Sequence, residues 1–113
     1  MNSKLVISLD FELFWGMIDT SNLNEYQSNI EGVWEAIPQI LKLFKKFNIS
    51  ATWATVGMLM CKNYNHWQEM RLNQSQLYSN DILSKDRINQ LIKNNEKLFF
   101  ARDLVQLIQD YED

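Results

Sequence analysis

The chain contains few of the residues that build redox centres, metal clusters and phosphate loops. Its 113 residues include one cysteine, one histidine, one proline and three glycines. The single cysteine, Cys61, excludes an intrachain disulfide and a cysteine-ligated metal cluster. Because the glycines lie far apart, at positions 16, 32 and 57, they form no glycine-rich phosphate loop. The sequence also has no G-x-S-x-G motif and no cysteine–histidine arrangement for nucleophilic catalysis.

Positive charge and long apolar runs are also scarce. The formal net charge is -3, which provides no basic patch for nucleic acid or for an anionic lipid surface. Only five residues separate Lys4 from Asp10, too few for the apolar region of a signal sequence or for a membrane span. The sequence therefore predicts a cytoplasmic protein that neither inserts into a membrane nor binds nucleic acid.

The hydrophobic content, 46% of the chain, is sufficient for the core of one small domain. Two apolar runs rich in β-branched residues, Lys4–Leu9 and Ile49–Val56, predict strands. Between them, a helix is predicted to begin at Ser28, which has capping-box spacing to Glu31, and to run to Asn48. Strand, helix and strand in this order predict two parallel strands in an α/β fold.

The segments outside this strand–helix–strand unit carry weaker patterns. We expect Trp15–Gln27 to form a polar loop, and Pro38 to kink the helix or to open a second one. The segment Lys62–Leu83, rich in Asn, Gln and Tyr, is expected to be an excursion over the surface. Two amphipathic helices are predicted after it, one capped by Ser84 and one beginning near Arg102.

Two carboxylates close the first predicted strand, within the segment LVISLDFELFWG at residues 5–16. Asp10 and Glu12 point the same way if the chain stays extended, and α/β folds build active sites at the carboxyl ends of strands. In such a pair, one acid can bind a metal ion while the other takes a proton from metal-bound water. The structural alternative is that these acids cap a turn or pair with a lysine.

Other side chains that could carry chemistry are explained as well by structural roles. A catalytic zinc ordinarily takes three protein ligands, and His66 has no second histidine at ligand spacing, so we interpret it as a loop histidine. Trp15, Trp53 and Trp67 could stack on a sugar, although core packing or an amphipathic loop role is the simpler interpretation of each of them.

Two segments together resemble a known family. LVISLDFELFWG, followed after the helix GVWEAIPQILKLFKKFNI by SATWATVG, is similar to the start of the polysaccharide deacetylases, carbohydrate esterase family four. The branch found with surface-polysaccharide genes is the most similar. The resemblance implies an irregular parallel (β/α) barrel, with this chain supplying the first two strands and their helices. It further implies removal of N-acetyl groups from amino sugars of polysaccharides, with a divalent metal such as zinc held by one aspartate and two histidines.

The resemblance also implies roles for individual residues. Asp10 matches the family's first aspartate, the catalytic base. The commoner motif has a second aspartate beside it, where this chain has Phe11, so the metal-ligand role passes to Glu12. Trp15, in the aromatic segment that follows, is the candidate residue for binding the N-acetylated sugar or polysaccharide precursor.

One motif of the family is absent from this sequence. The remaining metal ligands lie in an H-x-x-x-H motif, and the chain has a single histidine. We therefore expect residues 1–113 to form one partial domain, truncated before that motif, which binds the metal weakly and has little deacetylase activity alone.

Three other interpretations stay open. The chain could be a non-catalytic α/β fragment that associates with a separately encoded C-terminal half, or with itself, through an unpaired sheet edge. The D-x-acid pattern could instead build a phosphatase-like site. A glycosidase acid pair is the third, although such acids usually come from different strands.

Overall fold

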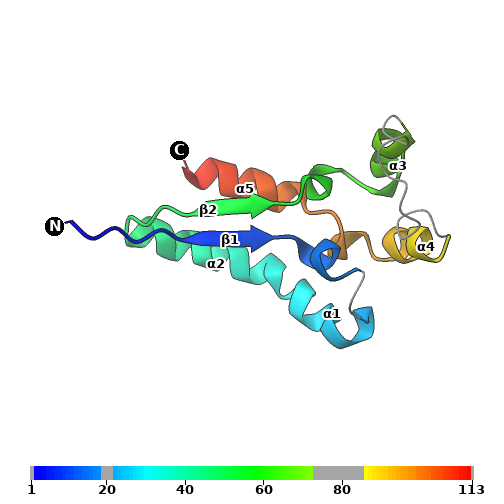
Figure 1. Ribbon diagram of the computed structural model, residues 1–113, viewed down its shortest axis with the longest axis horizontal. Helices are drawn as coiled ribbons and strands as arrows, with labels where there is room; N and C mark the ends of the chain where they lie inside the picture. Colours follow the sequence, from blue (N-terminus) through cyan, green and yellow to red (C-terminus); the bar gives the residue numbers. More distant parts are fainter. Residues whose placement is uncertain (1, 19–21, 73–85, 113) are drawn as a thin grey trace.

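The computed structural model describes residues 2–18, 22–72 and 86–112, which form a mixed α/β fold (Figure 1). The fold is mostly helical, and its two strands are parallel, so the predicted class and strand direction are confirmed. The strands are β1 (Ser8–Phe11) and β2 (Thr52–Thr55). The described residues also form the α-helices α1 (Leu23–Glu31), α2 (Val33–Lys46), α3 (Tyr64–Leu72), α4 (Asp86–Asn94) and α5 (Arg102–Glu112), and the short 3-10 helices η1 (Leu13–Met17), η2 (Gly57–Met60) and η3 (Glu96–Leu98).

The small sheet has one covered face and one open face. Phe11 of β1 and Trp53 of β2 share the covered face, where their rings meet edge to face with centroids 6.4 Å apart. Helices α2 and α5 pack against each other and border Trp53 on this side. The open face consists of exposed residues that alternate with the covered ones, namely Ser8, Asp10, Thr52 and Ala54. Parallel sheets are ordinarily covered on both faces, so this open face is unusual.

Both strands are shorter than their apolar runs. We predicted strands over Lys4–Leu9 and Ile49–Val56, whereas the ladder pairs Ser8 with Thr52 at one end and Phe11 with Thr55 at the other. A strand forms only where a neighbouring strand supplies hydrogen bonds. The turn after α2, with Asn48 at φ 52°, keeps the chain away from the first strand until residue 52. The apolar arm before β1, which contains Leu5 and Val6, is consequently left exposed.

Helix boundaries differ from the prediction on both sides of Gly32. The expected loop Trp15–Gln27 contains the end of η1 and the first half of α1. The cap of α1 is Asn22, whose side-chain oxygen accepts from the Asn24 N–H at 3.1 Å. The predicted start at Ser28 was therefore wrong, because Ser28 lies inside α1. The second helix begins at Val33, so Pro38 lies within it and does not open it.

The expected surface excursion Lys62–Leu83 was wrong in its first half. Residues 64–72 form α3, whose first turn is held by Asn63 through its side-chain oxygen, 2.9 Å from the His66 N–H. Residues 73–85, including the predicted cap Ser84, lie outside the described part of the chain. The two later helices are confirmed as α4 and α5.

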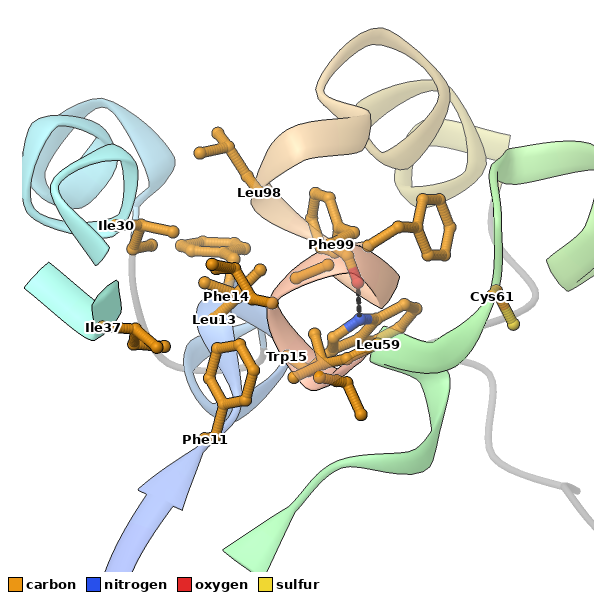
Figure 2. Packing of buried hydrophobic residues seen from close by; sticks show 14 of the residues in the cluster. Phe11, Leu13, Phe14, Trp15, Ile30, Ile37, Leu59, Cys61, Leu98 and Phe99 are labelled. Carbon is orange, nitrogen blue, oxygen red and sulfur yellow. Dashed lines mark hydrogen bonds between the residues drawn. The ribbon is translucent and has the colours of Figure 1, made fainter. Parts of the chain in front are cut away.

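The core lies beyond the carboxyl ends of the strands (Figures 1 and 2). Its most deeply buried large side chains come from η1, η2, α4 and the segment after η3: Phe14, Leu59, Ile92 and Phe99. The strands point into this end of an elongated molecule of 52 × 30 × 25 Å, while the amino end of β1 and the carboxyl end of α5 lie at the other. Within the described residues, no helix combines the length and apolar character needed to cross a membrane.

Candidate functional site

Asp10 lies next to the last residue of β1, on the open face of the sheet. Its partner in the ladder is Ala54, and the last hydrogen bond between the two strand segments runs from the Val56 N–H to the Phe11 carbonyl at 3.0 Å. Beyond that bond the two segments separate, one into η1 and the other into η2. The side chain of Asp10 is exposed to solvent. The predicted position of this acid at the end of a strand is confirmed.

Glu12 is not placed by the strand. Its backbone, at φ -125° and ψ -25°, leaves the extended conformation and begins η1. The half-buried side chain folds back over Gly16, where its carboxylate occupies the space that a Cβ atom would need. Leu13, with φ 51°, completes the turn in the left-handed region, and its burial in the core offsets the backbone strain. The condition for Asp10 and Glu12 to share a face, a chain that stays extended, is therefore not met.

Trp15 lies in the core. Figure 2 shows its indole N–H donating to the Phe99 carbonyl oxygen, at 2.6 Å, and the side chain is only 7% exposed. Its ring meets the ring of Phe99 edge to face at 5.2 Å and that of Trp67 at 5.6 Å. These contacts support the core interpretation of Trp15 and Trp67, and stacking of Trp15 on a sugar would require the ring to be uncovered.

The described residues do not assemble a complete metal site. Nowhere in this part of the chain do three or more His, Cys, Asp or Glu side chains come together, whereas a catalytic zinc takes three protein ligands. The His66 ring is engaged locally, since its Nδ1 accepts from the Lys62 N–H at 3.0 Å. Asp10 and Glu12 therefore do not fit a metal by themselves, and the metal-ligand role of Glu12 stays a prediction.

Cys61 is a buried thiol. Its side chain is 2% exposed, and its sulfur lies 3.7 Å from that of Met70. Burial raises the pKa of the Cys61 thiol above its ordinary value, because the thiolate would be poorly solvated there. These observations agree with a role for Cys61 as a small hydrophobic residue.

Sequence reasoning missed Trp34, which lies near the start of α2. Its indole N–H donates to the Lys97 carbonyl oxygen at 3.0 Å, across 63 residues of sequence. The half-buried ring borders two adjoining grooves of about 550 and 270 Å³ between α2 and η3. A single tryptophan in a helical pattern gives no sequence signal for such a position, since the contact depends on a distant segment.

Comparison with known proteins identifies no family for this chain: no protein-family model, curated protein or solved structure matches it. Membership of the polysaccharide deacetylases therefore stays a prediction, carried by the residues of the two segments that suggest it.

Proposed function

We propose that this chain supplies the strand–helix–strand part of a hydrolase that removes N-acetyl groups from amino sugars of polysaccharides, with Asp10 as its base. The observation that carries the proposal is the exposure of Asp10 at the end of a parallel strand, on a sheet face that no described helix covers. Substrate sites of α/β proteins lie at this end of the strands. The resemblance of residues 5–16 and 50–57 to the deacetylase segments adds the reaction type.

The chemistry available to Asp10 is proton transfer. An exposed carboxylate can accept a proton from a water molecule as the water attacks the acetamide carbonyl. Besides Glu12, the donors for a divalent metal such as zinc would have to come from outside the described residues, on a separate polypeptide or in another segment. The chain alone is consequently expected to release little or no acetate.

Complementation tests this proposal directly. The chain is mixed with the C-terminal segment of a polysaccharide deacetylase that carries the H-x-x-x-H motif, and acetate release from N-acetylglucosamine oligosaccharides is measured with added zinc or cobalt. We expect turnover only in the mixture, and its loss in Asp10→Asn. Asp110→Asn, at an exposed site on α5, is the matched control and should leave turnover unchanged.

Two results would contradict the proposal. One is robust acetate release by the chain alone, because a complete site would then exist without the missing ligands. The other is turnover in the mixture that Asp10→Asn does not lower. Phosphate release from an aryl phosphate would support the phosphatase-like alternative instead.

A non-catalytic role in association is the second candidate, and a specific observation favours it. The sheet has two strands in the described residues, so the outer edges of both are open to pairing with another chain. Binding of the C-terminal segment without acetate release, measured by size-exclusion chromatography of the same mixture, would support this role over the hydrolase.

A further inference from the structure

Trp34 is held in a fixed orientation with its ring at a surface. The hydrogen bond from its indole N–H to the Lys97 carbonyl joins α2 to η3 and uses the only polar group of the side chain. Any ligand of Trp34 must therefore interact with the ring itself. Two grooves meet at this ring, so a ligand larger than one ring could extend from one groove into the other.

Hydrogen-bonding groups of both kinds surround the ring in the larger groove. Lys93, Lys97 and Asn94 supply donors, while Glu31 and Glu96 supply acceptors. Each carboxylate accepts a hydrogen bond from the protein within the described part of the chain. The Gln27 side-chain amide donates to Glu31 at 2.9 Å, and the Tyr64 backbone N–H donates to Glu96 at 3.0 Å. A carboxylate has a second oxygen that can accept from a ligand.

The formal charges of the larger groove cancel, since two carboxylates and two ammonium groups line it, and the further residues of the smaller groove add only one net positive charge. A groove for a phosphate or another anion would instead carry an excess of cations. A flat aromatic surface surrounded by balanced donors and acceptors matches a pyranose ring, which has apolar C–H faces and hydroxyl groups around its edge.

We propose that the groove beside Trp34 binds a neutral oligosaccharide, with one sugar ring stacked on the indole. The binding does not involve Asp10 and does not depend on hydrolysis. It gives the chain a saccharide-binding site separate from the end of β1, whatever chemistry takes place there.

Cellotetraose, which carries neither charge nor N-acetyl groups, is the probe. The full chain is labelled with nitrogen-15 and titrated while the indole N–H resonances are followed. We expect the Trp34 signal to shift with saturation, while the signal of Trp53, which is half-buried beside the carboxyl-terminal half of α2, stays in place. Asn94→Ala should weaken the affinity several-fold and Trp34→Ala by about tenfold, equivalent to ~1.4 kcal/mol.

Further variants separate binding from folding. Trp34→Phe keeps a ring face but loses the bond to Lys97, so it should retain part of the affinity. Asn94 is exposed at the end of α4, so Asn94→Ala reports on binding even if the Trp34 variants do not fold. Asp10→Asn should bind cellotetraose as the unaltered chain does, which separates a failure of this proposal from a failure of the hydrolase.

Three results would overturn the proposal. The first is the absence of any Trp34 shift at the highest soluble concentration of cellotetraose. The second is an affinity that Asn94→Ala and Trp34→Phe both leave unchanged. The third is tighter binding of inorganic phosphate than of cellotetraose at the same residues, which would make the groove an anion site.

Discussion

The indole of Trp15 ties the segment after β1 to the segment before α5. Its hydrogen bond to the Phe99 carbonyl spans 84 residues and is buried, and Phe99 is fully buried beside it. A buried carbonyl that loses its partner costs about 1–3 kcal/mol, whereas one that water can reach costs less. We therefore expect Trp15→Phe to lower the free energy of unfolding by at least that amount, since some ring volume is also lost.

Trp34→Phe is the matched control for this prediction. It also removes an indole bond to a backbone carbonyl, but the carbonyl belongs to the exposed residue Lys97. Urea unfolding of both variants should show the smaller loss, below roughly 1 kcal/mol, for Trp34→Phe. Equal losses of unfolding free energy would show that the buried Trp15 bond stabilises the fold no more than the exposed Trp34 bond.

The second prediction at the residue scale concerns the pH dependence of Cys61. Because burial raises the pKa of the thiol in the folded chain, the unfolded chain loses this proton first as the pH rises. The contribution of Cys61 to stability is therefore fully present below the ordinary thiol pKa of 9.0 and declines above it. Alkylation at pH 8 should be slower in the folded chain than in urea, because the thiolate is the reactive form. Equal rates would show that the thiol is accessible.

At the scale of elements, Gly32 is the residue that connects α1 to α2. Its backbone is helical, at φ -61° and ψ -21°, and its N–H donates to the Ser28 carbonyl at 3.0 Å. A Cβ atom added there would lie 3.4 Å from the nearest atoms, an ordinary contact. Gly32→Ala should therefore stabilise the chain by about 0.5–1 kcal/mol, because alanine loses less backbone entropy than glycine on folding.

Gly32→Pro provides the opposite test at the same position. Proline has no N–H to donate to Ser28, so this variant should destabilise the chain by about 3 kcal/mol. Thermal unfolding of the pair would distinguish the two effects. A destabilising Gly32→Ala would mean that the joint requires the flexibility of glycine.

The elements also show which features local sequence can predict. The helix α5 follows from apolar spacing alone, and two β-branched runs with a helical pattern between them were enough to predict parallel strands. The ends of those strands were not predictable, because they depend on where the partner strand begins at Thr52. The start of α1 was missed because Asn22 caps it, whereas Ser28 has the same capping chemistry but lies inside the helix.

The candidate site, like the strands, could be predicted only in part from the sequence. The position of Asp10 at the end of a strand follows from the apolar run that precedes it. The orientation of Glu12 does not, because it depends on a left-handed turn at Leu13 and on the absence of a side chain at Gly16. The burial of Trp15 and the position of Trp34 at the surface grooves depend on Phe99 and Lys97, which are distant in sequence.

At the scale of the whole molecule, the arm before β1 is the most exposed apolar segment among the described residues. Leu5 is 86% exposed and Val6 is 81% exposed, although both belong to a run with strong strand propensity. The outer edge of β1 continues from this arm and has no partner strand in the described part of the chain. An exposed apolar strand edge is a site where a second chain can add a strand.

We therefore expect the chain alone to self-associate, and the arm to be responsible. Light scattering coupled to size-exclusion chromatography should show species larger than a monomer that increase with concentration. The double variant Leu5→Lys with Val6→Lys should shift this equilibrium toward the monomer, because charged side chains oppose pairing at sheet edges. Leu43→Lys is the control, since Leu43 is 54% exposed but belongs to the helix α2 and so presents no strand edge. Association that both variants reduce equally would point to general apolar exposure as its cause. A monomer at every concentration would contradict the prediction, because it would show that the edge of β1 does not pair with a second chain.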